Sequence, residues 1–281
     1  MPWARVWEDQ EVPPEVRRIF GDVRASFDLP FVPTLFKVLA NAPDYLRVMW
    51  NDLGPVAYSR EFQTAGKAME EFVRALTIAG GWCFSDHQRL LAGQKFTPND
   101  VDQLGNIAAT FSRLSSRMAL FTRLMQKGYS GGQPGRVSNG GEASALSRLL
   151  TLHVPAESEA GLRVWLIYSD IKRTLSARHV LSMYRVLSPF PPYLAAVWLD
   201  SKKMLAEPAF APARDEVAKR AGGLLLGLPA KDHRAAARNL SPQQWREIEE
   251  VVDSDARLAP QFALLSALWQ RSFSGKSTIA A

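Results

Sequence analysis

Residues 33–52 (PTLFKVLANAPDYLRVMWND) and residues 181–200 (LSMYRVLSPFPPYLAAVWLD) are two versions of one segment, and this repetition constrains the fold more than any other feature. The match extends without a gap over residues 19–52 and 167–200, at a constant shift of 148. Identical pairs include Ile19/Ile167, Asp22/Asp170, Val38/Val186, Leu39/Leu187, Pro43/Pro191, Tyr45/Tyr193, Leu46/Leu194, Trp50/Trp198 and Asp52/Asp200. Two copies of one supersecondary unit are expected to pack against each other, here about a pseudo-twofold axis.

The apolar spacing predicts that nearly every element is a helix. Three- and four-residue steps place one apolar face on the segment after Val101, at Leu104, Ile107, Phe111, Leu114, Met118, Phe121 and Leu124. Thr97 with Pro98 and Ser241 with Pro242 are typical of an N-cap followed by the first helical residue. A further helix is expected to start near Ser59. The fold class is therefore all-α, an internally duplicated helical bundle.

A glycine-rich stretch divides the chain. Residues 128–145 contain six glycines, which is typical of a linker or a long surface loop. We therefore expect a helical repeat over residues 1–127, a Gly/Ser-rich linker over 128–160 and a second helical repeat over 161–281.

The bulk composition excludes several classes of protein. Apolar residues make up 47% and charged residues 22% of the chain, as in a globular protein. No run of 18 apolar residues could cross a bilayer, and the polar N-terminus lacks the apolar region of a signal peptide. The basic residues behind the net charge of +6 are interleaved with acidic ones, so neither nucleic acid nor a membrane is expected as a partner. The single cysteine, Cys83, fits a reducing cytoplasm.

The chain resembles the DehI family, the group I 2-haloacid dehalogenases. The resemblance covers most of the chain and rests on the duplicated unit, on LPFVPTLFKVLANAPDYLRVMW, on RAGGLLLGLP and on TPNDVDQLGNIAATFSRL. It implies an all-helical pseudo-dimer with a small pocket between the repeats, commonly associating as a homodimer. A carboxylate of the second repeat would activate water, which displaces halide from C2 of a 2-haloalkanoate. This chemistry requires no metal and no organic cofactor.

The same resemblance assigns site residues by position. The pocket aromatics of the first repeat fall on Phe31 and Thr34, and the polar group that orients water falls near Ser112. The general base follows a serine, and here that pair reads Ser182-Met183. Because a thioether cannot take a proton from water, the position of the base is occupied by a residue without the required chemistry.

Two replacements for the missing base are open. Asp170 also follows a serine, but its repeat partner is an aspartate too, which favours a structural role for both. His179 occupies the repeat position of Phe31 and titrates near neutral pH. Together with Ser182 and Tyr184, it could line a polar site in the same pocket.

A thiol site is the remaining candidate. Cys83 lies four residues before His87, similar to the pair in AhpD-like thiol enzymes, although the second cysteine of that pattern is replaced by Gly80. No histidine spacing suggests a metal site. The sequence thus favours a 2-haloacid dehalogenase-family hydrolase whose activity is retained, altered or lost. The alternatives are a non-catalytic protein that binds a small carboxylic acid and an AhpD-like thiol enzyme.

Overall fold

The computed structural model describes residues 5–93, 96–129, 153–228 and 240–273, and these residues form helices and loops without a strand. The all-α fold class is therefore confirmed. The helices are α1 (Pro14–Phe27), α2 (Thr34–Leu39), α3 (Pro43–Tyr58), α4 (Arg60–Ala79), α5 (His87–Ala92), α6 (Pro98–Tyr129), the 3-10 helix η3 (Glu157–Glu159), α7 (Leu162–Leu175), α8 (Ser182–Arg185), α9 (Pro191–Ala206), α10 (Phe210–Leu224) and α12 (Pro242–Arg271). Most of the expected linker lies outside the described residues, and its first two residues belong to the end of α6.

The predicted caps set the starts of the long helices. Ser241 accepts a hydrogen bond from the backbone N–H of Gln244, whose side chain accepts one from the Ser241 backbone in return. Thr97 makes the equivalent exchange with Asp100 at the start of α6. Such reciprocal bonds satisfy N–H groups that the first turn of a helix leaves without partners.

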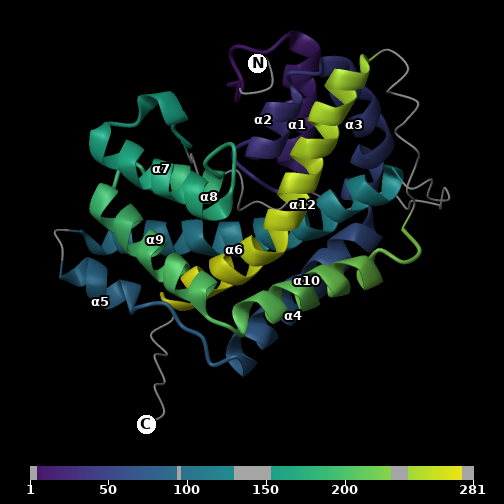
Figure 1. Cartoon of the computed structure of the whole chain (residues 1–281). Coiled ribbons are helices and arrows are strands. Elements are labelled where there is room, and N and C mark those ends of the chain that lie inside the picture. Colours follow the sequence, from purple (N-terminus) through teal and green to yellow (C-terminus); the bar gives the residue numbers. More distant parts are fainter. Residues whose placement is uncertain (1–4, 94–95, 130–152, 229–239, 274–281) are drawn as a thin grey trace.

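Helices α6 and α12 form the centre of the molecule. They cross in the middle of Figure 1 and pack against each other more extensively than any other pair. The apolar face predicted for α6 is buried along its whole length. One continuous hydrophobic core joins the two halves of the chain.

The helix boundaries recur at the shift of 148 found in the sequence. Helix α7 begins and ends 148 residues after α1, and α9 does so after α3. Helices α1 and α7 both end on a residue in the left-handed conformation, Asp28 with φ 56° and Ser176 with φ 49°. These are the only non-glycine residues with positive φ in the described part of the chain. The repetition of a strained cap supports the interpretation of an internal duplication.

Candidate active site

A small chamber of about 60 Å³ lies between the starts of α2 and α8, the middle of α6 and one face of α12. Its lining is mostly apolar, which is typical of a site for a small ligand. The lining residues are Pro33, Thr34, Leu35, Phe111, Leu114, Ser115, Met118, Thr122, Leu181, Ser182, Met183, Asp255, Ala259 and Phe262.

Residues of both matching segments line this chamber. The hydroxyl oxygens of Thr34 and Ser182, which are repeat-equivalent residues, lie 2.9 Å apart and form a buried hydrogen bond. In a bond between two hydroxyls one group donates, so the accepting hydroxyl keeps its own proton for another acceptor. The pair can therefore offer one hydrogen bond to a ligand in the chamber.

Met183 lies in the chamber wall at the position where the family resemblance puts the base. Its side chain is 3% exposed, and Met118 of α6 also lines the cavity. This part of the wall holds two thioethers, which have no proton chemistry.

Asp255 of α12 is the one carboxylate that lines the chamber among the described residues. Its carboxyl group makes no hydrogen bond or ion pair with the described part of the chain, and burial raises the pKa of Asp255 to about 7. A carboxyl group with this pKa is half ionised near neutral pH, which suits a general base.

Sequence reasoning missed Asp255, although the sequence contains a signal for it. Ile248, Val252, Asp255, Ala259 and Phe262 follow steps of three and four residues, so they share one face of α12. The other four are apolar. A carboxylate in an apolar helical stripe is therefore the pattern that could have revealed this residue.

Three other predicted residues lie beside the chamber rather than in its lining. Phe31 stacks on Phe111 with ring centroids 5.3 Å apart, so it supports the wall from behind. Ser112 is buried, but the serine of α6 that lines the cavity is Ser115, one turn further along the helix. Tyr184 is fully buried, and its ring packs against Trp198 and Phe262.

Asp170 does not fit the role of an alternative base. Its carboxylate accepts hydrogen bonds from the indole N–H of Trp198, from Lys202 and from Arg173. The bond from Trp198, followed by that from Lys202, lowers the pKa of Asp170 to about 2. It lines none of the cavities described for this molecule. Its role is to fasten α7 to α9.

Cys83 and His87 do not form the expected pair on one helix. Cys83 is exposed in the loop before α5, whereas His87 is fully buried as the first residue of α5. The ring nitrogens of His87 bond to Asp200 at 3.1 Å and to the Tyr193 hydroxyl at 3.1 Å. Neither nitrogen is left for the thiol.

The histidine belongs to a buried structural network. Trp269 donates to the Tyr193 hydroxyl, and Asp200 also accepts two hydrogen bonds from Ser85. Burial alone would raise the pKa of Asp200, but the bonds from His87 and Ser85 outweigh it and lower the pKa. This network ties the segment before α5 to α9 and α12.

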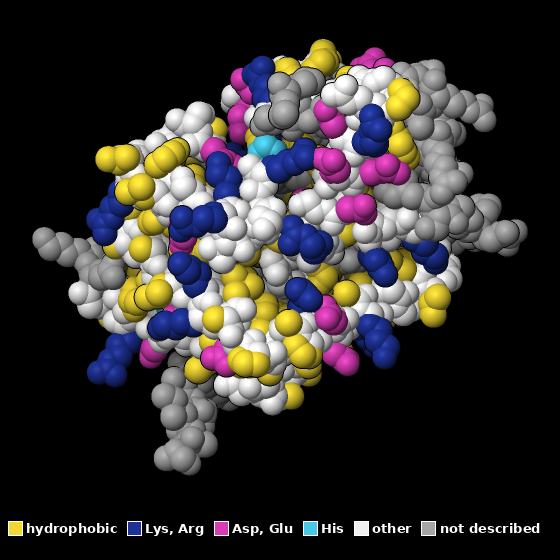
Figure 2. All heavy atoms as spheres, in the orientation of Figure 1, with side chains coloured by type: hydrophobic (Ala, Val, Ile, Leu, Met, Phe, Trp, Pro, Cys, Tyr) yellow, Lys and Arg dark blue, Asp and Glu magenta, His cyan; other side chains and the backbone are white. Residues whose placement is uncertain are grey.

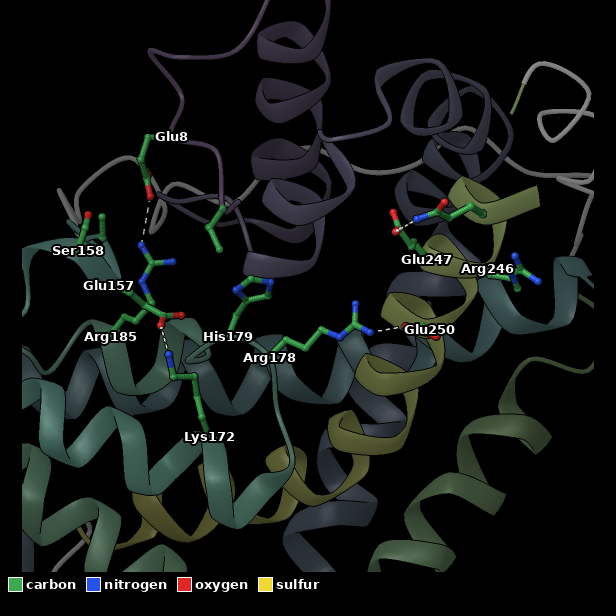
Figure 3. A pocket seen from close by; sticks show the side chains of 13 residues that line it. Glu8, Glu157, Ser158, Lys172, Arg178, His179, Arg185, Arg246, Glu247 and Glu250 are labelled. Carbon is green, nitrogen blue, oxygen red and sulfur yellow. Dashed lines mark hydrogen bonds and ion pairs between the residues drawn. The ribbon is translucent and has the colours of Figure 1, made fainter. Parts of the chain in front are cut away.

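His179 lies in a second, polar cavity of about 840 Å³, called the basin below. In Figure 3 His179 stands between the ion pair of Arg185 with Glu8 and the pair of Arg178 with Glu250. The basin's lining residues are Val6, Glu8, Ala156, Glu157, Ser158, Lys172, Arg178, His179, Arg185, Gln243, Arg246, Glu247 and Glu250.

The visible surface carries no charge patch of one sign. Figure 2 shows Lys and Arg side chains interspersed with Asp and Glu over the whole face. None of the described helices is long and apolar enough to cross a membrane. The described residues contain no cluster of three His, Cys, Asp or Glu side chains that could hold a metal ion.

The fold is that of the D-2-haloacid dehalogenases. A solved complex of such an enzyme with L-LA superimposes with a TM-score of 0.86 at 20% identity, and covers 96% of both chains. A mutant enzyme in complex with D-2-CPA gives a TM-score of 0.81 at 19% identity over 95% of each chain.

The sequence comparisons define the family. The family model of halocarboxylic acid dehydrogenase DehI matches residues 30–184, more than half of the chain, and the chain therefore belongs to the DehI family. An (R)-2-haloacid dehalogenase of Rhizobium sp. (strain NHG3) is 24% identical over 82% of this chain and 90% of its own length. One from Pseudomonas putida is 22% identical over 85% of this chain and 82% of its own length.

Proposed function

We propose that this protein is a hydrolytic 2-haloacid dehalogenase that uses Asp255 as its general base. The observation that carries the proposal is a lone carboxylate, with a pKa raised to about 7, in the chamber whose wall also holds Met183, the residue on which the family resemblance puts the base. Membership of the DehI family and the activity of the curated relatives support the reaction type. The substrate is a short 2-haloalkanoate, because the chamber measures only about 60 Å³.

The reaction needs one proton acceptor. The Asp255 carboxylate takes a proton from a water molecule as its oxygen attacks C2 from the side opposite the halogen. The C2–O bond forms while the C2–halogen bond breaks, and the halide leaves with the bonding electron pair. The product is a 2-hydroxy acid of inverted configuration. Because Asp255 does not itself attack carbon, no ester is formed.

The remaining lining supplies binding. The hydroxyl of the Thr34–Ser182 pair that keeps its proton donates to the substrate carboxylate. Met183, Met118, Phe111 and Phe262 surround the carbon–halogen bond and exclude bulk water. Because bulk water is excluded, the water molecule positioned by Asp255 is the nucleophile that reaches C2.

The replacement at Met183 is then a relocation of the base. The carboxylate moves from the wall formed by α8 to the wall formed by α12, and both walls face the same cavity. The thioether in the old position keeps the surroundings of Asp255 apolar, which holds its pKa high.

The decisive experiment measures halide release by the purified protein from D- and L-2-chloropropionate and from 2-bromoacetate. We expect release by the wild type and a loss of about 10²- to 10⁴-fold in Asp255→Asn. Asp253→Asn is the matched control, because Asp253 is an exposed carboxylate on the same helix.

The other outcomes contradict the proposal in distinct ways. Full activity in Asp255→Asn combined with loss in Asp170→Asn would mean that the base is Asp170. No release by the wild type, with tight binding of 2-chloropropionate in calorimetry, would favour the carboxylate-binding protein. Homodimerisation, which the family resemblance implies, and a cytoplasmic location, which the single cysteine favours, stay predictions.

A further inference from the structure

Three cavities follow one another from the chamber to the surface basin. Between the chamber and the basin lies a cavity of about 40 Å³, called the neck below. The neck shares Thr34 and Asp255 with the chamber, and it shares Arg178 and His179 with the basin. A space of this size holds one or two water molecules.

His179 stands where the neck meets the basin. Its Nε2 atom is buried and has no hydrogen-bond partner in the described structure. A buried polar atom without a partner is uncommon, and it indicates a site where a water or a ligand atom completes the bonding. The adjacent cations are already engaged, since Arg185 pairs with Glu8 and Arg178 pairs with Glu250.

Each catalytic cycle leaves Asp255 with a proton that must depart. The chamber offers no second ionisable group among its described lining residues. In the neck, the ionisable side chains are those of Asp255, His179 and Arg178, and an arginine stays protonated. His179 is therefore the one group beside the neck that can accept the proton.

We propose that His179 carries the proton from Asp255 through water in the neck to the basin. This proposal rests on the proposed function, because it assumes that Asp255 receives a proton in each turnover. The Asp255 carboxyl O–H bond breaks, a neck water passes the proton on, and an N–H bond forms at Nε2 of His179. The imidazolium then releases a proton to solvent in the basin, which restores both groups. His179 acts through Asp255 and does not touch the substrate.

Burial shifts the pKa of both groups. Burial lowers the pKa of His179, opposed by the negative charge of Glu157, while burial raises the pKa of Asp255. Because the pKa of His179 falls while that of Asp255 rises, the transfer to His179 runs slightly uphill in free energy, and the release of the proton to solvent completes it. The charged groups that line the neck and the basin with His179 are Glu8 of the N-terminal segment, Glu157 of η3, Lys172 of α7, Arg178 of the loop before α8, Arg185 of α8, and Arg246, Glu247, Glu250 and Asp255 of α12.

The first test does not depend on activity. The chain has four histidines, so the ring protons of His179 can be followed by NMR from pH 4 to 9 and assigned with His179→Gln. We expect Asp255→Asn to lower the midpoint of His179 by several tenths of a pH unit, because a nearby negative charge is lost. The exposed His153 should not move. An unchanged His179 curve in Asp255→Asn would overturn the relay, whatever the activity.

The second test uses turnover. His179→Gln should reduce kcat for halide release about tenfold, leave the first turnover and kcat/KM unchanged, and regain rate when imidazole is added as a proton carrier. His153→Gln is the matched control. Its steady-state halide release should equal that of the wild type, both with and without added imidazole. A slow first turnover that imidazole does not restore, or an unaffected steady state, would contradict the proposal.

The two proposals fail separately. If the wild type releases no halide but the His179 titration depends on Asp255, the dehalogenase function fails and the coupling through the neck stands. If halide is released and the titrations are independent, the relay fails and the dehalogenase function stands.

Discussion

The hydroxyls of Thr34 and Ser182 form a 2.9 Å hydrogen bond between residues 148 positions apart. The same shift relates α1 to α7 and α3 to α9. Residues close to a twofold axis contact their own equivalents, and this pair behaves in that way. We infer that a pseudo-twofold axis relating the two matching segments passes through the chamber.

Removing either hydroxyl should weaken binding more than chemistry. Thr34→Val keeps the shape of the side chain, and Ser182→Ala removes the partner. Because a hydrogen bond to a charged group contributes about 1.5–3 kcal/mol, we expect KM for 2-chloropropionate to rise at least about tenfold. The change in kcat should stay within about threefold.

The double variant tests whether the hydroxyls act as a pair. Since one hydroxyl positions the other, the rise in KM of the double variant should be smaller than the product of the rises in the two single variants. Steady-state kinetics on the three variants decides this. Two independent effects that multiply would argue against a shared hydrogen bond to the substrate.

The pH dependence of dehalogenation should report Asp255. A base must be unprotonated, so kcat/KM should rise with pH, reach half its maximum near pH 7 and level off above that. An ordinary aspartate, with a pKa near 3.9, would give a flat profile above about pH 5. Initial rates between pH 5 and 9 distinguish the two cases, and a flat profile would count against Asp255.

Asp255 should also reduce stability at high pH. Its folded-state pKa is raised above its unfolded value, so the folded state binds the additional proton between about pH 4 and 7. The contribution of Asp255 to the free energy of unfolding is therefore fully present below about pH 4, and it is lost as the pH rises through 7.

Asp255→Asn removes this pH-dependent loss. We expect Tm to rise by about 2–6 °C at pH 8 and to change little at pH 4. Calorimetry at both pH values measures the difference, and Asp253→Asn controls for the helix. A lower Tm at pH 8 would mean that the Asp255 carboxylate has a stabilising partner.

The His87 network predicts a stability effect without a thiol function. His87→Leu removes one hydrogen-bond partner from the buried Asp200 carboxylate and one from the Tyr193 hydroxyl. Each loss should lower the free energy of unfolding by about 1–3 kcal/mol. Tm should fall by about 5–10 °C. Cys83→Ser should alter neither Tm nor halide release, because the thiol is exposed and lies outside the network. A loss of activity in Cys83→Ser would instead support the hypothesis of a thiol enzyme.

The parts of this fold set by local sequence could be predicted. The caps at Ser241 and Thr97 depend on residues within one turn, and the buried face of α6 follows from its own periodicity. The apolar stripe of α12 singles out Asp255, but the cavity that its side chain lines could not be derived from local sequence. Whether its side chain meets solvent or a cavity depends on how α12 packs across α6, a contact between residues more than a hundred positions apart. The segment DSDAR around it is charged, which favours a surface interpretation.

Met183→Asp tests whether the base has moved within one chamber. In the Asp255→Asn background, the new carboxylate stands at the family position in a wall of the same cavity, so halide release should recover by at least about tenfold. In the wild-type background two carboxylates would share the chamber. Their repulsion should raise the pKa of one of them and shift the pH profile upward. Met183→Leu, which keeps the volume, should restore nothing. If Met183→Asp alone were active and Asp255→Asn had no effect in either background, the chamber would have lost its base rather than relocated it.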